Sequence, residues 1–409
     1  MTTPVDTPKP WSRHSRLLLV GGLAIIVLTG SVYSYLSFKE NRGRANLSLA
    51  RNVLEKLVFQ PDGRESTATA DRAEQQLKSV FGTSSERSAQ LLIVALARSR
   101  GVRVSVRDLD QDTQRCNTAD IAVASLLFFK GGELSLADKM AAAAVNRGDE
   151  RSRALKAATI VSYELGRDED TARYAAEWSK IEPRDAMPWQ YLAYVAEDRG
   201  FSNEAVIAFR NQIDCTSGSA DESRRRLVFH LIKLGNAAEA RKEFDKLQST
   251  SQSVAQESRL LEARLLFLEG KLSETQQILD QTKFTEQERT DATLLRAQIL
   301  MERSQFDNAT TELRDCIARD PANQDAHYLL GQALARSGKP AEAKKQLETH
   351  RQLLDLKVRI NSLERQAGRQ SDNVDARLTL AELYRQLGLM EQSKLWSDSA
   401  RNAKSSRSR

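Results

Sequence analysis

The chain has 409 residues, of which 6% are aromatic and 28% are charged, and its formal net charge is +6. Residues that favour helices are abundant, and no segment shows the alternation of apolar and polar side chains that marks a half-buried strand. These features exclude a sheet-based fold and predict an all-α protein. A chain of this length also exceeds what one compact core usually holds.

The positive charge is concentrated at the two ends of the chain. Residues 1–45 carry six basic and two acidic side chains, and residues 401–409 carry four basic side chains and no acidic one. The body between them is therefore slightly acidic, and its charges of both signs are interspersed. Basic ends around such a body suit a membrane surface better than a nucleic acid, so we expect no nucleic-acid partner.

A basic tail, residues 1–16, precedes an uncharged and largely apolar segment, residues 17–38. A helix of these 22 residues rises about 33 Å, which is enough to cross a hydrocarbon core of about 30 Å. Arg16 and Lys39 can hold its two ends among the lipid headgroups. We therefore expect a single transmembrane helix that anchors the chain at its N-terminus.

A cleaved signal peptide is the alternative for this segment, because residues 17–28 have the length of a signal-peptide core. The apolar run continues through Leu36 and Phe38, which favours an uncleaved anchor. Basic residues flank the segment on both sides and do not decide its orientation. Since a long C-terminal body is often translocated, we expect the body on the extracytoplasmic, periplasmic side of a bacterial membrane.

Residues 39–117 are predicted to form juxtamembrane helices and an irregular first unit. Apolar residues recur with helical spacing over residues 46–60, and residues 70–81 and 86–100 are predicted to form a helix pair. The polar stretch 102–117 is expected to be a connector.

Eight turn residues then follow one another at steps of 34 or 35 residues, apart from a last step of 50. They are Gly132, Gly166, Gly200, Gly235, Gly270, Ser304, Gly338 and Gly388. Five positions after each stands a small residue: Ala137, Thr171, Ala205, Ala240, Thr275, Ala309, Ala343 and Ser393. A period near 34 residues predicts hairpins of two helices, A and B, that stack as a solenoid.

The frame of the repeat follows from placing each turn residue at position 15. Paired helices approach within about 8–10 Å only where the residues at their crossing are small. The small residues are therefore expected to be buried against the partner helix. Units are predicted to begin near Thr118, Ser152, Ala186, Asp221, Gln256, Thr290, Gln324 and Val374.

This pattern resembles the tetratricopeptide repeat. In one unit Trp189 and Leu192 match the W-x2-L motif of helix A, and Ala205 and Phe209 match the A-x3-F motif of helix B. The resemblance implies a right-handed α-solenoid behind the transmembrane helix. The implied organisation is tetratricopeptide-like repeats over 118–357, an inserted helix extension and linker over 358–373, a last repeat over 374–400 and a basic tail over 401–409.

The step of 50 residues contains the insertion. Neither proline nor glycine interrupts residues 341–367, so we expect one lengthened helix that ends at Gly368. Its additional apolar face must be covered by the last repeat or by a second chain. A homo-oligomer formed through the 341–367 helix is therefore an alternative to packing within one chain.

Motifs that carry chemistry are missing from the sequence. The three cysteines and four histidines have no spacing typical of a disulfide framework or a metal site, and no phosphate-binding loop or nucleophile motif occurs. We therefore expect no cofactor, no metal and no enzymatic activity. The alternative, an enzyme with an unrecognised site, would need His230 or His327 in a pocket with carboxylates.

The resemblance also implies a binding groove. In this family, helix A lines a concave surface through its second, fifth, ninth and twelfth positions, a surface suited to an extended or helical peptide. The family's carboxylate clamp needs asparagines where this chain has Ile160 and Tyr191, so that clamp is not predicted. The groove candidates are Arg153, Lys156, Tyr163, Gln190, Tyr194, Arg225, Phe229, Arg264, Phe267, Gln298, Tyr328 and Gln332.

These features together predict a membrane-tethered scaffold or adaptor that binds protein or peptide partners in assembly or secretion at a bacterial membrane. The alternative is a cytosol-facing membrane receptor that passes client proteins to a translocation machine. The sequence does not name the partner.

Overall fold

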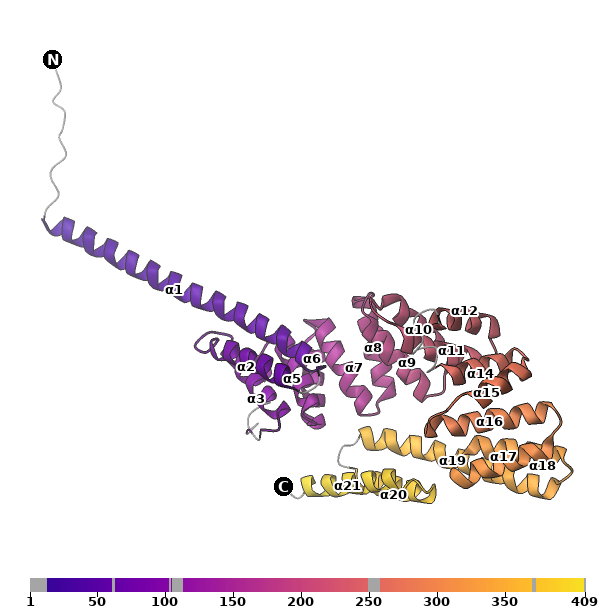
Figure 1. Ribbon diagram of the computed structural model, residues 1–409. Helices are drawn as coiled ribbons and strands as arrows, with labels where there is room; N and C mark the ends of the chain where they lie inside the picture. Colours follow the sequence, from indigo (N-terminus) through magenta and orange to yellow (C-terminus); the bar gives the residue numbers. More distant parts are fainter. Residues whose placement is uncertain are drawn as a thin grey trace, which may run out of the picture. The chain divides into compact units, whose positions relative to one another are not determined.

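The computed structural model describes residues 13–60, 63–102, 104, 113–248, 258–369 and 373–407, with side chains from residue 34 onward apart from a few isolated positions. Every regular element in these ranges is an α-helix, which confirms the predicted all-α class (Figure 1). The chain forms two compact units, residues 1–154 and residues 155–409.

The first unit contains helices before the regular repeats. α2 packs mainly on α1, and α3 packs mainly on α5. The helices predicted over residues 70–81 and 86–100 both exist and contact each other, but each packs more extensively on another helix. The helices are α1 (Arg13–Leu57), α2 (Arg64–Lys78), α3 (Glu86–Ser99), α5 (Thr118–Lys130), α6 (Leu134–Arg147) and the first residues of α7 (Arg151–Glu164).

Polar contacts join α1 to α5 in the first unit. Arg51 of α1 lies 3.6 Å from the fully buried carboxylate of Asp120 in α5. Burial raises the pKa of Asp120, and the positive charge of Arg51 opposes this effect. Lys130 donates to the backbone carbonyls of Leu57 and Gln60, at 3.2 and 2.8 Å, and so binds the end of α1. The last turns of α1 are thus held against α5.

The predicted transmembrane segment, residues 17–38, lies within α1, but the side chains of residues 17–33 lie outside the described residues. Over the part of the chain that the structure describes, no helix combines the length and the apolar character that a membrane span needs. The anchor therefore stays a prediction from the sequence. Most of the predicted connector, residues 103 and 105–112, also lies outside the described residues.

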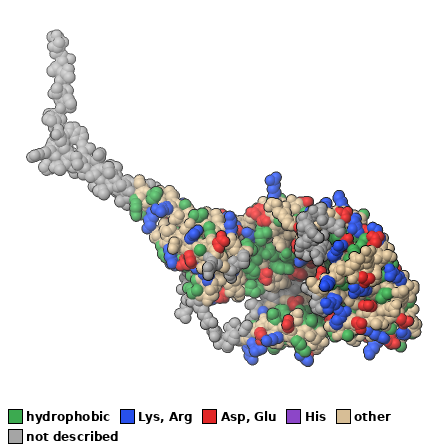
Figure 2. All heavy atoms as spheres, viewed as in Figure 1, with side chains coloured by type: hydrophobic (Ala, Val, Ile, Leu, Met, Phe, Trp, Pro, Cys, Tyr) green, Lys and Arg blue, Asp and Glu red, His purple; other side chains and the backbone are tan. Residues whose placement is uncertain are grey.

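The second unit is a solenoid of alternating A and B helices (Figure 1). The A helices are α7, α9 (Ala186–Asp198), α11 (Asp221–Lys233), α14 (Arg259–Leu268), α16 (Glu286–Glu302), α18 (Gln324–Arg336) and α20 (Val374–Gln386). The B helices are α8 (Asp168–Ile181), α10 (Ser202–Cys215), α12 (Ala237–Gln248), α15 (Leu272–Gln281), α17 (Phe306–Arg319), α19 (Pro340–Arg369) and α21 (Met390–Arg407). Basic and acidic side chains are interspersed over the visible face (Figure 2).

The predicted turns are confirmed at all eight positions. Each turn residue adopts a positive φ between 58° and 78°, and the one that is not glycine, Ser304, has the smallest value. The N–H that follows each turn residue bonds the carbonyl five residues earlier, as Phe201 N–H does to Ala196 at 2.8 Å. A helix end closed by this hydrogen bond needs a residue in the left-handed backbone conformation. Glycine adopts that conformation readily, which explains why glycine recurs at the turns.

Seven of the eight small residues five positions later are buried at the crossing of their helix pair, and Ser393 in the last repeat is half-buried. Ala205, Ala240 and Ala309 are 0% exposed, which confirms the predicted frame. Where a hydroxyl replaces a methyl group it is satisfied locally, as between Ser162 and Thr171, whose oxygens lie 2.9 Å apart. The crossing thus accepts small residues of either polarity.

The lengthened helix is also confirmed. α19 runs unbroken for 30 residues. The apolar face of its added part, with Ile360 and Ala367, packs against Leu380 and Leu383 of α20. The last repeat therefore covers the part of the apolar face around Ile360, whereas Leu354 and Val358 are exposed. Residues 370–372 of the predicted linker lie outside the described residues.

Replacement of Ala309 by leucine should overpack the crossing of α16 and α17. Three additional heavy atoms would be forced into a site that has no free surface, so we expect a loss of about 1–3 kcal/mol in the free energy of unfolding. The measurement is the thermal melting midpoint. The same substitution at Ala335, which is exposed on α18, is the control and should leave the midpoint nearly unchanged. Equal melts for the two variants would contradict the frame.

Candidate functional site

The A helices of three consecutive repeats, α9, α11 and α14, carry a set of charged and aromatic side chains. In α9 and α11 these residues recur at intervals of three or four, which places them on one face of each helix. The N-terminus of α9 is fixed by Asp185, whose carboxylate accepts from the backbone N–H of Met187 at 2.9 Å. The regular stacking of the repeats brings these faces next to one another.

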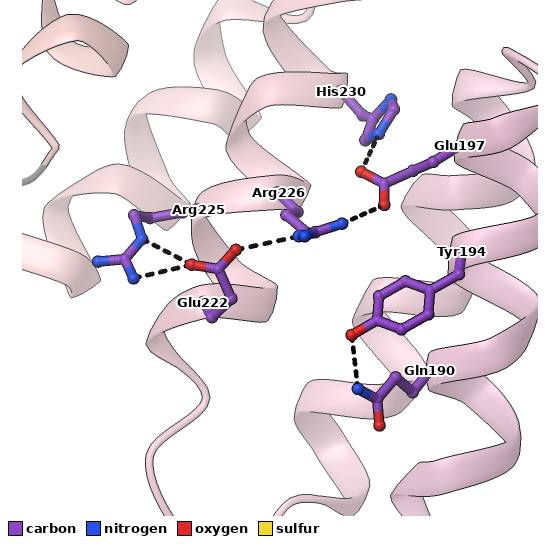
Figure 3. Close-up of polar contacts among 7 residues, drawn as sticks. All are labelled: Gln190, Tyr194, Glu197, Glu222, Arg225, Arg226 and His230. Atoms are coloured by element: carbon purple, nitrogen blue, oxygen red, sulfur yellow. Dashed lines mark hydrogen bonds and ion pairs between the residues drawn. The ribbon is translucent and has the colours of Figure 1, made fainter. Parts of the chain in front are cut away.

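A chain of ion pairs joins α9 to α11 (Figure 3). Glu222 accepts from Arg225 at 2.8 Å and from the Nε atom of Arg226 at 3.0 Å. The other end of the Arg226 guanidinium donates to Glu197 of α9 at 2.5 Å. The second carboxylate oxygen of Glu197 lies 3.0 Å from Nε2 of His230. Two carboxylates therefore alternate with three cationic or hydrogen-bonding side chains.

Both carboxylates of this chain are held in the ionised form. Burial raises the pKa of Glu197, but hydrogen bonds from His230 and Arg226 outweigh it, and the pKa lies below its ordinary value. The same balance, with hydrogen bonds from Arg225 and Arg226 opposing burial, lowers the pKa of Glu222. The network consequently stays charged at neutral pH.

His230 lies in the interior of the repeat stack. Its Nδ1 atom is 3.2 Å from the Ser202 hydroxyl of α10, and its ring stacks on Phe209 at 6.0 Å between centroids. Serine, histidine and glutamate thus stand in hydrogen-bonding order, as in a hydrolase triad. His230 and Ser202 are both buried, however, and they do not line the open hollow beside them. The contacts explain His230 as a residue that joins three helices.

A cluster of three tyrosines adjoins the ion pairs. Tyr163 of α7 lies 5.5 Å from Tyr191 and 5.8 Å from Tyr194, between ring centroids. The hydroxyl of Tyr194 accepts from Gln190 at 2.6 Å, and the Arg226 guanidinium lies 5.3 Å from its ring centroid. Burial raises the pKa of Tyr191 to about 12, so its hydroxyl stays protonated. The cluster is a rigid and partly polar surface.

An open hollow of about 250 Å³ lies between α11 and α14. The guanidinium of Arg264 lies 5.4 Å from the ring centroid of Phe229 and is held by Asp291 of α16 at 2.8 Å. Cationic heads around apolar side chains can contact a peptide's acidic and apolar groups together. The hollow is lined by Glu222, Arg225, Arg226, Phe229, Leu260, Leu261 and Arg264.

The structure brings together six of the residues predicted for the groove. Arg225, Phe229 and Arg264 line the hollow. Tyr194 borders it through its contact with Arg226, and Gln190 and Tyr163 follow through their contacts with Tyr194. This part of the predicted surface therefore exists as a set of mutual contacts.

The other six predicted residues lie elsewhere. Arg153 belongs to the first unit, where its Nε atom lies 3.2 Å from Glu55. Phe267 packs into the core formed by α14 and α16, and Tyr328 packs on His350 at 5.2 Å. Lys156 is half-buried on α7, the helix of Tyr163, and Gln298 and Gln332 are half-buried on α16 and α18.

The sequence analysis missed the carboxylates that organise the site. Glu197 and Glu222 stand at the twelfth and second groove positions of their units, and Leu260 at the fifth, but they were not among the predicted groove residues, whereas Arg226 and Leu261 stand outside the four positions. One signal was present: residues 224–226 are three consecutive arginines, an uncommon run in an otherwise mixed helix. The four groove positions include only Arg225 of this run, so Arg226 was not predicted.

Comparison with known proteins agrees with this architecture. Residues 300–353 match the family model described as the tetratricopeptide repeat. No curated protein matches the chain. A tetratricopeptide repeat protein from Parabacteroides merdae is similar in structure, with a TM-score of 0.48 and 14% identity over 58% of this chain and 93% of that one. The Cut9–Hcn1 hetero-tetramer of the APC/C is similar with a TM-score of 0.40 and 15% identity, over 73% of this chain and 59% of that one. The structure shows a solenoid of helix hairpins, and its residues 300–353 match the tetratricopeptide repeat.

Replacement of Glu197 by glutamine should loosen the contact between α9 and α11. The variant leaves Arg226 and His230 without their shared carboxylate, so we expect a loss of about 1–3 kcal/mol at pH 7, measured by urea unfolding. Glu274→Gln, at an exposed position of α15, is the control and should change little.

The loss should also depend on pH. Because the pKa of Glu197 is lowered in the folded chain, its stabilisation is present above the unfolded-state pKa of about 4.3. It disappears as the pH falls through the lower folded-state pKa. The parent and Glu197→Gln should therefore converge in acid, and a difference that persisted unchanged at low pH would contradict the assignment of the network.

Proposed function

We propose that this chain is a scaffold whose A-helix surface, from the tyrosine cluster to the hollow of Arg225, Phe229 and Arg264, binds an extended or helical segment of a protein partner. The observation that carries the proposal is the continuity of this surface across α7, α9, α11 and α14. A solenoid presents such a surface without conformational change, because each repeat is held by its neighbours.

The composition of the surface supports a protein partner. Tyrosine, phenylalanine and arginine are the residue types that most often dominate binding energy at protein interfaces. The three tyrosines are held by one another, and Phe229 is held under Arg264, so little side-chain freedom is lost on binding. A preorganised set of this kind favours a segment with at least one large apolar side chain.

Replacement of both Tyr194 and Phe229 by alanine should weaken partner binding by at least about tenfold, since each removes an aromatic contact in the centre of the surface. The partner is to be identified by crosslinking in native membranes, and binding of the purified proteins measured by calorimetry. Phe201→Ala removes another exposed aromatic residue, at the turn before α10, and is the control. Undiminished binding by the double variant would refute the proposed surface.

We further propose that residues 17–38 tether this scaffold to a bacterial membrane, where it serves in assembly or secretion. The support comes from the sequence, which has 22 uncharged positions between Arg16 and Lys39. A tether raises the effective concentration of the binding surface near partners on the same membrane. The body is proposed to face the periplasm, and a cytosol-facing receptor for translocated proteins is the alternative.

The tether predicts that the full chain stays in membrane vesicles after alkaline carbonate extraction, whereas a chain lacking residues 1–38 is released. Protease added to intact, oriented vesicles then reports the side of the body. Protection in right-side-out or inside-out vesicles distinguishes the two orientations. Release of the full-length, unprocessed chain by carbonate, or loss of the N-terminal segment by processing, would contradict the anchor.

A further inference from the structure

The carboxylate of Glu222 lies at the opening of the hollow and accepts hydrogen bonds from two of the three arginines that line it. The side chain of Glu222 is 62% exposed, whereas that of Arg225 is 24% exposed. The carboxylate therefore covers the Arg225 guanidinium from the solvent side. The chain's own acidic group thus occupies the position at which an incoming carboxylate would meet both arginines.

We propose that Glu222 is an internal competitor for an acidic ligand, and that the partner segment carries an aspartate or glutamate next to a large apolar residue. The incoming carboxylate displaces Glu222 from Arg225, while the apolar side chain contacts Phe229 and Leu261 in the hollow. This inference rests on the proposed binding function and names the chemistry of its ligand.

The geometry matches a carboxylate. The two guanidinium groups already bind one planar carboxylate, that of Glu222. Arg225 donates two hydrogen bonds to one of its oxygens, at 2.8 and 3.1 Å, and Arg226 donates one to the other oxygen. Planar guanidinium groups recognise carboxylates in this way with high directional specificity. A ligand carboxylate can reproduce these bonds without moving α11, which carries both arginines.

Fixed negative charges disfavour a nucleic acid at the same place. Arg226 is shared with Glu197, and Arg264 is held by Asp291, so each cation that faces the hollow has a carboxylate of the chain beside it. A single acidic side chain can fit between these groups, whereas a phosphate backbone would run past several of them and be repelled. The apolar lining of Phe229, Leu260 and Leu261 likewise suits a peptide side chain.

The competitor is weakly held. Glu222 pairs with residues three and four positions along the same exposed helix, and each such pair shifts an equilibrium only about twofold. The bond from Arg226 to Glu197 joins two helices and is more buried, so it remains when Glu222 leaves. Glu222 therefore reduces the affinity for an acidic ligand several-fold and excludes weaker ligands without closing the site.

The test uses two fluorescein-labelled peptides that differ in one residue, Gly-Ser-Gly-Asp-Phe-Gly-Ser-Gly and its asparagine counterpart, with binding followed by anisotropy. For Glu222→Gln we expect the aspartate peptide to bind about fivefold tighter than to the parent, and the asparagine peptide to be unchanged. The matched control is Glu382→Gln, because Glu382 pairs with Arg385 at the same spacing on α20, at 2.7 and 2.8 Å. This control should bind both peptides as the parent does.

Several outcomes would overturn the competitor. These are equal affinities of the parent and Glu222→Gln for the aspartate peptide, the same gain for both peptides, no detectable binding of either peptide, or a larger gain for a labelled single-stranded oligonucleotide. Failure of the proposed binding function gives a different result. In that case the identified partner would still bind the Tyr194 and Phe229 double variant. Melting curves of Glu222→Gln that match the parent show that a change in affinity is not a folding defect.

Discussion

The close crossing of helix A and helix B in every hairpin is the contact on which the second unit depends. At Ala205, Ala240 and Ala309 the crossing has no exposed surface, so the two helices are separated by little more than their backbones. This proximity sets the distance from one hairpin to the next and aligns the outer faces of successive A helices. The neighbouring positions of Tyr194, Arg226 and Arg264 follow from that spacing rather than from any bond between them.

The repeats could be predicted from the sequence because their signals are local. A left-handed turn residue such as Gly200, followed by a small residue such as Ala205, constrains only a few residues of the chain, and each hairpin repeats the same requirement. The helices before Thr118 lack this signal, and their packing depends on contacts distant in sequence, such as Arg51 with Asp120. Six of the twelve groove candidates meet in the structure and six do not. Positions along a helix indicate which residues share a face, but not which residues of different repeats contact one another.

Ion pairs between successive repeats add a second, weaker regularity. Glu197 with Arg226 and Arg264 with Asp291 join neighbouring A helices, while Arg314 with Glu342 joins neighbouring B helices, and the partners stand 27 to 29 residues apart. Exposed pairs of this kind contribute little stability, whereas partly buried ones restrict how one hairpin can rotate on the next. In the candidate site the same pairs leave the arginines oriented and matched by carboxylates, which is why its selectivity depends on displacement rather than on excess charge.

The lengthened α19 changes what the last repeat can do. A regular hairpin would pack directly on α18, but the added turns carry α20 away and leave a cavity of about 400 Å³ between α18, α19 and α20. The carbonyl oxygen of Glu364 lies 3.9 Å from the position that a Cβ atom on Gly166 would take, so the end of α19 reaches the turn between α7 and α8. The lengthened helix therefore packs on α18 and α20 and also comes near the first hairpin of the second unit.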